Sequence, residues 1–508
     1  MMMRFFFVCA LAATGILAAT AEMTIEYRGE GMANGGRGKF APFYMASNRH
    51  GIITQAKDVM FRASVWKPLD ADSGRFSYGF GVDALGGHGS AVAYDRYNQA
   101  GVVVANGQRP PSVWLQQLYA SIRYRRFYLT IGMEEQGSAL LNDRLSSGDM
   151  TESANARPIP QVRVGFVDFV DVPFTKGWLQ VNGVIAFGRF MDGTWLENHT
   201  NRNGFITTGA LYHYKRLYFR IAPQQQLSLT VGMQAGAQIS GTKIHWSRGE
   251  QTSVDKKSFR LKDLWDMFIP GHDRIEYYPG NSVGDWDIHL TWRLPADGHI
   301  LHAYWQKLWE DGSGIGFQNG MDGLWGLEYT APEEFGWISG VVVEYLDLTN
   351  QSGPIHWDPV LNPGTDLTSH TSGRDNYYNN GGFNGWANYG MSIGSPMVPS
   401  PLYNINGQMS FLNNRIRGFH IGIDGHIGNN VDWRVLGGWR KGWGTYNTPM
   451  NPSRYDTSFM VEASWRPRFL NGLTFHLQGA MDHGTIYGNN LGAFVSASYH
   501  GNLTFGKK

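Results

Sequence analysis

Polar and aromatic side chains gather in one long segment, residues 347–414, and they are the residues best suited to binding a ligand. The cluster comprises Asp375, Asn376, Tyr377, Tyr378 and Trp386. Aromatic rings present apolar faces to the C–H patches of sugars, while amides and carboxylates bond to sugar hydroxyls. The cluster therefore indicates a carbohydrate-binding loop. The alternative is that Asn and Gly make turns and the rings form a small core of the loop itself.

A second cluster lies within residues 146–160. Arg157 has a planar, five-donor guanidinium that suits bidentate binding of a carboxylate or phosphate. An ion pair between Arg157 and Asp149 that only orders the loop is equally open. Both residues are candidate ligand-binding residues, and an acidic sugar is the ligand class that Arg157 favours.

Signals for catalysis and metal binding are weaker. Asp482 and His483 are neighbours at a strand end, but no nucleophile–base set converges with them, and no H-E-x-x-H motif occurs. The acidic, glycine-rich residues 310–314 and 322–323 lack the spaced oxygen ligands of a known calcium loop, so we interpret them as turns. We expect no catalytic residue, no metal and no cofactor.

The elements that must position these clusters are strands with alternating faces. In residues 473–482, one parity is mainly apolar (Leu473, Phe475, Leu477), and the other is mainly polar (Thr474, His476). Successive side chains of a strand point to opposite faces. The pattern repeats along the chain, with aromatic residues near strand ends and charges of both signs on the polar face. It predicts an all-β protein, a transmembrane antiparallel β-barrel.

We predict about eighteen strands, an even number as in bacterial barrels. They are 40–47, 59–67, 76–85, 113–124, 126–134, 161–167, 178–188, 205–221, 227–235, 285–293, 299–308, 324–330, 337–346, 415–427, 431–440, 457–466, 473–482 and 491–500. The long connections then fall at one end, which we take as extracellular, and residues 258–268 predict a short helix in one loop. Residues 205–221 are long for one strand. Lys215 shares parity with apolar residues there, so either a bulge or a hairpin is needed.

Residues 1–21 have the features of a secretory signal peptide, with a basic start, an apolar stretch and an A-x-A site. We expect the mature barrel domain to span 22–508 and to lie in the cell outer membrane. The only cysteine, Cys9, lies in this leader, which excludes disulfides from the mature chain. With 43 basic and 42 acidic residues, the chain has no global field to attract nucleic acid.

Several segments resemble the capsule-assembly family of outer-membrane barrels, the Wzi type. They are 146–160 (SSGDMTESANARPIP), 173–183 (PFTKGWLQVNG), 310–328 (EDGSGIGFQNGMDGLWGLE), 351–354 (QSGP), 375–381 (DNYYNNG) and 394–404 (GSPMVPSPLYN). The resemblance implies an occluded eighteen-stranded barrel that attaches capsular polysaccharide to the cell surface as a lectin-like, non-enzymatic protein. The chain departs from the family in one respect. Only a glycine-rich stretch, 29–38, precedes the first expected strand, with no room for an N-terminal helical bundle.

Three functions compete. The first is a surface anchor for capsular or other extracellular polysaccharide, a monomer held in outer-membrane lipid. The second is a porin or substrate channel, which requires an open lumen, whereas loops 236–284 and 347–414 are large enough to cover the mouth. The third is a surface hydrolase, which requires a catalytic set converging at one rim.

Overall fold

The computed structural model describes residues 23–69, 75–260, 263, 268, 280–295, 298–310, 312–332, 336–353 and 373–505. The expected signal peptide, residues 1–21, lies outside the described residues. Most of the expected loop helix, 258–268, lies outside them as well. Within the described part of the chain, no helix has both the length and the apolar character needed to cross a membrane.

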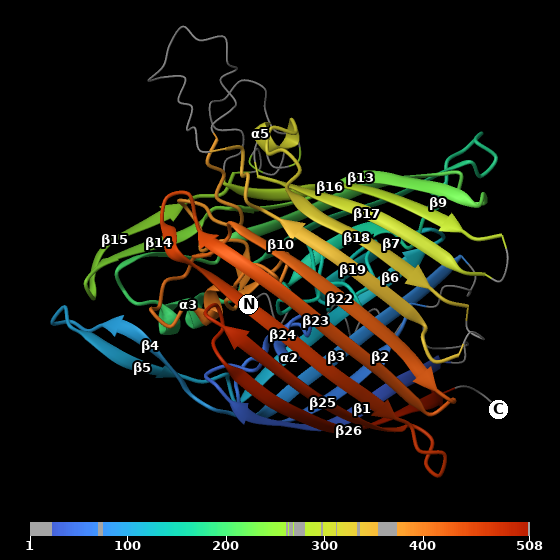
Figure 1. The fold of residues 1–508 in the computed structure, drawn as a ribbon, viewed down its shortest axis with the longest axis horizontal. Coiled ribbons are helices and arrows are strands. Elements are labelled where there is room, and N and C mark those ends of the chain that lie inside the picture. The colour runs from blue at the N-terminus through green and yellow to red at the C-terminus, as the bar shows by residue number, and fades with distance from the viewer. Residues whose placement is uncertain are drawn as a thin grey trace, which may run out of the picture.

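One antiparallel sheet closes on itself to form a barrel (Figure 1). Its strands are β1 (Met23–Arg37), β2 (Asp58–Lys67), β3 (Phe76–Gly89), β6 (Val113–Tyr124), β7 (Phe127–Met133), β8 (Gln161–Phe166), β9 (Val170–Asp171), β10 (Leu179–Arg189), β12 (Leu211–Ile221), β13 (Leu227–Ile239), β16 (Asn281–Arg293), β17 (Ile300–Trp309), β18 (Gly323–Thr330), β19 (Gly340–Asp347), β22 (Ile416–Ile427), β23 (Val431–Gly444), β24 (Pro449–Trp465), β25 (Leu473–Gly484) and β26 (Asn490–Phe505). β8 and β9 pair in turn with β10 and count as one strand, so the wall has 18 strands, as predicted. β1 pairs with β26 from Met23↔Phe505 onward and closes the barrel.

The wall is apolar outside and polar inside. Leu477 is 60% exposed and Val495 is 49% exposed, and the two face each other on the outer surface of β25 and β26. Their chain neighbours Gln478 and Ser496 point inward and are buried. This arrangement is the reverse of a soluble protein and is the one a barrel adopts when lipid surrounds it. The alternation read from the sequence is therefore confirmed.

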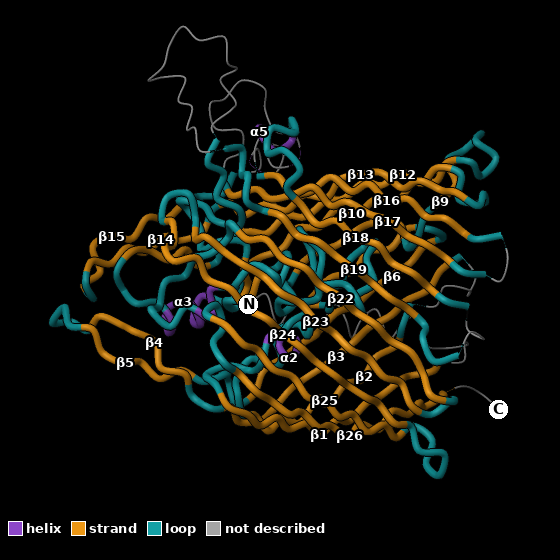
Figure 2. The backbone as a smooth tube through the Cα atoms, viewed as in Figure 1, coloured by secondary structure: helices purple, strands orange, loops and turns teal. Residues whose placement is uncertain are grey.

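The long connections leave the barrel at the end opposite Met23 and Phe505 (left in Figures 1 and 2). Short turns join the strands at the other end. At the long-loop end, the hairpin β4 (Val92–Tyr97)–β5 (Val103–Gln108) projects beyond the wall. A second sheet of β11 (Gly204–Thr208), β14 (Gly241–Ser247) and β15 (Glu250–Lys257) projects beside it. We refer to this end as the extracellular end.

Two strand predictions are wrong. Residues 40–47 hold a short helix, α2 (Phe43–Ala46), whose four side chains are buried inside the barrel. Pro42 precedes the helix and suits a helix start. The first strand is instead β1, which contains the glycine-rich stretch 29–36. Alternation is hard to see there because glycine has no side chain to mark a face.

The expected strand 205–221 is two strands. Gly209 has φ +63°, a conformation that favours glycine, and it separates β11 in the outer sheet from β12 in the barrel wall. Lys215 lies on the outward, apolar face of β12. The free-energy cost of a charge on this face is reduced because Phe268 covers it. Lys215 Nζ donates a hydrogen bond of 2.5 Å to the Phe268 carbonyl oxygen and lies 5.2 Å from the ring centroid.

Candidate functional site

Three segments from the extracellular end fold back into the barrel and form its core (Figure 2). They are residues 38–57, residues 134–160 and residues 373–415. The first carries α2. Its Tyr44 hydroxyl lies 2.7 Å from His420 Nδ1 on β22, and its Phe43 amide donates to Asp482 on β25 at 3.0 Å. Because Asp482 holds this helix, it does not form a catalytic pair with His483, which points to the outer face.

Residues 134–160 are attached to the wall by charged and polar groups. Arg163 on β8 forms a bidentate ion pair with Glu152, with both N···O distances 2.9 Å. Glu344 on β19 accepts hydrogen bonds from Ser146 Oγ at 2.7 Å and from the Ser147 amide at 2.8 Å. Both acids are buried, and a buried ion pair or hydrogen bond is costly to break from one side. The segment is therefore held firmly across the lumen.

Asp149 belongs to this attachment. It accepts hydrogen bonds from Gln234 Nε2 at 2.7 Å and Gln306 Nε2 at 3.0 Å, and also from Ser138. Burial raises the pKa of Asp149 to about 6. All the recorded partners of Asp149 belong to the barrel wall or to its own segment, and they do not include Arg157. The ion pair between Arg157 and Asp149 that the sequence left open is not formed.

Tyr377, Tyr378 and Trp386 are each 0% exposed. Tyr377 donates to Asp322 at 3.1 Å, Tyr378 donates to the Met150 carbonyl at 2.6 Å, and Trp386 Nε1 donates to the Thr151 carbonyl at 2.8 Å. The expectation that these three rings present open faces to a sugar is wrong. Their polar ends are satisfied by neighbouring segments, and the rings belong to the core of the barrel interior rather than to a separate small core of the loop.

The two polar candidates of the same segment also serve internal contacts. Asp375 accepts a hydrogen bond from Ser352 Oγ at 2.6 Å and is buried. Asn376 is half-buried, and its side-chain oxygen accepts from Asn414 at 2.6 Å and from Asn379 at 3.0 Å. Asn376 is thus the only one of the five loop candidates that keeps more than a slight exposure.

Arg157 has different surroundings. Its guanidinium carbon lies 4.7 Å from the ring centroid of Trp114 and 4.9 Å from that of Tyr389. A guanidinium between two aromatic rings gains cation–π attraction while its N–H edge stays available. Burial lowers its pKa to about 10, so it remains charged at neutral pH, and no carboxylate of the described chain contributes to this shift. The site holds a half-buried cation without an ion-pair partner among the described residues.

Four separate segments build this arginine site. Trp114 lies near the extracellular start of β6, with its parity toward the interior. Tyr389 lies in the turn between β20 (Ala387–Asn388) and β21 (Met391–Ser392). Its backbone amide donates a hydrogen bond of 3.2 Å to the Asp192 carboxylate. Asn388 Nδ2 donates to the Arg157 carbonyl at 2.9 Å. A Cβ on Gly51 would lie 3.0 Å from Arg157 Cγ, so the backbone of segment 38–57 packs directly against the arginine.

Trp114 and Tyr389 were not among the sequence candidates. A signal for Trp114 was present, since it alternates with Val113 and Leu115, which both face outward. An aromatic residue on the inward parity at the extracellular rim marks a position facing the loops. Nothing local marks Tyr389, because its place beside Arg157 depends on how residues 373–415 fold into the barrel.

Charges on the inward, polar face of the strands form ion pairs with one another and with residues 134–160. Arg434 bonds Glu462 at 2.7 Å, Arg144 bonds Asp424 at 2.6 Å, and Arg466 bonds Asp432 at 2.5 Å. These pairs brace the wall and its plugging segment. These residues therefore do not form a row of unpaired charges along a conduction path.

The sequence also contains a G-x-S-x-G pattern at residues 390–394. In serine hydrolases this pattern needs a strand–turn–helix elbow that exposes the serine. Here Ser392 lies in the two-residue strand β21, is 0% exposed, and its hydroxyl has no recorded hydrogen-bond partner in the described chain. The pattern does not form a nucleophile site. Among the described residues, no group of three or more His, Cys, Asp or Glu is arranged to hold a metal.

The fold is similar to that of Wzi from Escherichia coli, described as an outer-membrane protein involved in group 1 capsule assembly and a carbohydrate-binding β-barrel. The TM-score is 0.56 at 11% identity, covering 95% of this chain and 85% of that one. Weaker matches include OccAB4 of Acinetobacter baumannii, with a TM-score of 0.45 at 10% identity over 96% of this chain and 100% of that one. OccK5 (OpdH) of Pseudomonas aeruginosa has a TM-score of 0.43 at 8% identity over 94% and 98%. No protein-family model and no curated protein matches the sequence. The resemblance to Wzi-type barrels is confirmed at the level of the fold.

Proposed function

We propose that this protein is a non-enzymatic outer-membrane surface protein that attaches an extracellular, acidic polysaccharide to the cell. The observation that carries the proposal is the arginine site of Arg157, Trp114 and Tyr389 at the extracellular end. A cation without a carboxylate partner attracts a sugar carboxylate or another acidic substituent, and the rings beside it offer apolar surface to the sugar. The carbohydrate binding ascribed to Wzi, which shares this fold, gives independent support.

The ligand contacts that we propose differ from those expected from the sequence. Arg157 remains the primary group, with Trp114 and Tyr389 in place of the buried rings of residues 377, 378 and 386. Asn376 is retained as a secondary contact because it is partly exposed. Asp149 and Asp375 act through structure, since they hold the segments that place the site.

A channel function is less well supported. Three segments cross the interior, and they are fastened by buried groups such as Glu344 and Glu152 rather than by loose contacts. A porin needs a continuous wet path, and opening one here requires breaking several of these contacts together. The weaker similarity of the fold to the Occ proteins does not support a channel function for this chain.

The experiment is retention of polysaccharide on encapsulated cells that carry Arg157→Gln in place of the parent protein. Arg454→Gln is the matched control, because Arg454 is an exposed arginine near the extracellular end of β24. We expect Arg157→Gln to release polysaccharide into the medium while Arg454→Gln retains it, at equal barrel levels in the outer membrane. Equal retention by both variants contradicts the proposal.

A further inference from the structure

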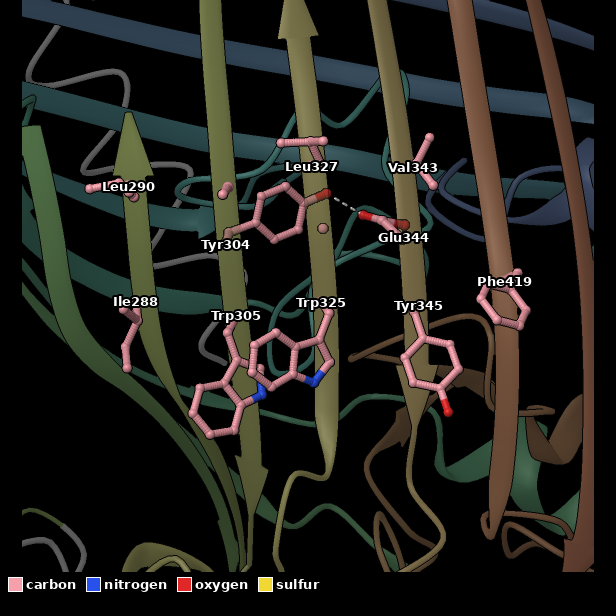
Figure 3. Close-up of a pocket in the computed structure, with 12 residues that line it drawn as sticks. Ile288, Leu290, Tyr304, Trp305, Trp325, Leu327, Val343, Glu344, Tyr345 and Phe419 are labelled. Atoms are coloured by element: carbon pink, nitrogen blue, oxygen red, sulfur yellow. Dashed lines mark hydrogen bonds between the residues drawn. The ribbon is translucent and has the colours of Figure 1, made fainter. Parts of the chain in front are cut away.

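A groove of about 480 Å³ runs along the outer wall of the barrel (Figure 3). It spans strands β16 to β22, and its outward-facing lining is almost entirely apolar. None of the outward-facing side chains that line it carries a charge. Nothing in the proposed polysaccharide function uses this surface, which lies on the membrane-facing side of the wall.

Two rows of cross-strand neighbours shape the groove. The row nearer the extracellular end runs Trp305↔Trp325↔Tyr345↔Phe419, and the two indoles stack with centroids 4.4 Å apart. The next row toward the short-turn end runs Leu290↔Ala303↔Leu327↔Val343. Ala303 is the small member of that row, so a hollow remains between the larger side chains on either side. The stacked indoles close the hollow toward the extracellular end (Figure 3).

The aromatic row marks the depth of the groove. Trp and Tyr side chains of membrane proteins concentrate at the level of lipid headgroups. Trp325 is close to the extracellular start of β18, and Trp305 is close to the extracellular end of β17. The hollow on the short-turn side of these rings therefore lies at the depth where the acyl chains of the outer leaflet begin, and it is continuous with the lipid-facing surface.

Positive charge lies beyond the aromatic row. Arg417 and Lys441 are direct cross-strand partners on β22 and β23, each two residues beyond the ring of Phe419 or Trp439 toward the extracellular end. Arg417 bonds Asp347 at 2.8 Å. Lys441 has no carboxylate partner in the described chain, and its recorded contact is the ring of Trp443 at 5.3 Å. One unneutralised cation thus lies on the strand next to the groove, about 7 Å beyond Trp439 along β23.

We propose that this groove binds one anionic lipid of the outer leaflet, with the headgroup phosphate on Arg417 and Lys441 and an acyl chain that runs from there past Phe419 and Tyr345 to the hollow beside Leu327. The apolar hollow gives a chain more contact than a smooth wall does, and the basic pair selects a phosphate-bearing headgroup. The site is separate from Arg157 and does not depend on polysaccharide binding.

Native mass spectrometry of the full-length protein in detergent tests the proposal, with phosphatidic acid and phosphatidylcholine of identical acyl chains as probes. Ala303→Leu fills the hollow with an outward-facing apolar side chain that folding tolerates. Ala497→Leu, outward-facing on β26 at the far side of the barrel, is its control. Lys441→Gln removes the cation, and Lys39→Gln is the control at an exposed lysine remote from the groove.

We expect the parent protein to retain phosphatidic acid in preference to phosphatidylcholine. Ala303→Leu should lower retention of both lipids relative to Ala497→Leu. Lys441→Gln should reduce the preference for phosphatidic acid by roughly five-fold relative to Lys39→Gln. Equal retention in the two leucine variants overturns the acyl-chain site, and an unchanged lipid preference in Lys441→Gln overturns the phosphate site.

Discussion

Tyr304 on β17 donates a hydrogen bond of 2.5 Å to Glu344 on β19, although β18 lies between these two strands (Figure 3). The contact is possible because Gly326 on β18 has no side chain. A Cβ there would lie 2.0 Å from the Tyr304 ring. Glu344 also holds the segment around Ser146, so this glycine links the wall to the plug of the barrel.

Replacing Gly326 by alanine should therefore loosen both the wall and the plug. The Tyr304 ring must move, and Glu344 loses a buried donor, which costs about 1–3 kcal/mol. Gly479→Ala is the control, because a Cβ at that outward-facing position meets nothing within 4 Å. The measurement is the temperature at which the folded band is lost on a gel. A Gly326→Ala protein as heat-resistant as Gly479→Ala contradicts the assigned role.

A charge at mid-height of the lipid face should impair assembly. Val461 is outward-facing, with Val435 and Gly479 as its cross-strand neighbours, midway along β24 between Trp465 and Thr457, the partner of Trp439. Val461→Arg should cost about 2–4 kcal/mol, whereas Leu503→Arg near the short-turn end of β26 should cost roughly 0–1 kcal/mol. The yield of folded protein after refolding into vesicles compares them. Equal yields argue against the membrane placement.

Purified protein should conduct ions poorly in a planar bilayer. The reason is that residues 38–57, 134–160 and 373–415 fill the interior. The first two are bonded to the wall through Asp482, Glu152 and Glu344, and the third is bonded to residues 134–160 through Tyr378 and Trp386. Insertion is checked beforehand by the heat-resistant folded band. A steady, porin-sized conductance would instead support the channel alternative.

Acidification should tighten the extracellular loops. Burial raises the pKa of Asp322 to about 6. This carboxyl accepts hydrogen bonds from the backbone amides of Asn350 and Gln351. Because the folded loops bind the proton more strongly than the unfolded chain, this group's contribution to stability falls as pH rises from about 4 through 6.

Hydrogen exchange around residues 350–353, corrected for the intrinsic effect of pH, checks this dependence. Protection should be greater at pH 5 than at pH 8, and the difference should shrink in Asp322→Asn, which cannot titrate. Stronger protection at pH 8 in the parent protein contradicts the assigned sign.

Most of the fold follows from alternation, which is local. Strands such as 113–124 and 473–484 reveal themselves because each outward apolar residue has an inward polar neighbour. β1 was not predicted because its glycines have no side chains that reveal an outward and an inward face. The residues of α2 were predicted as a strand because a short apolar run has no period that distinguishes a helix from a strand.

The site was less predictable because its members come from distant segments. Arg157 was chosen as a candidate for its chemistry and motif, and its binding role remains a prediction. Tyr377, Tyr378 and Trp386 have equally suitable chemistry, yet residues 373–415 fold inward and bury them. The type of a residue shows which ligands its side chain can bind. Whether that side chain is exposed depends on how several loops pack together.

The most direct test of the central claim is binding of an acidic polysaccharide to purified protein, measured by calorimetry at low and high salt. We predict that the parent protein binds it, that salt weakens binding, and that Arg157→Gln weakens binding at low salt by about 1–3 kcal/mol relative to Arg454→Gln. Trp114→Ala should weaken it as well. Binding that is unchanged in Arg157→Gln and insensitive to salt contradicts the account.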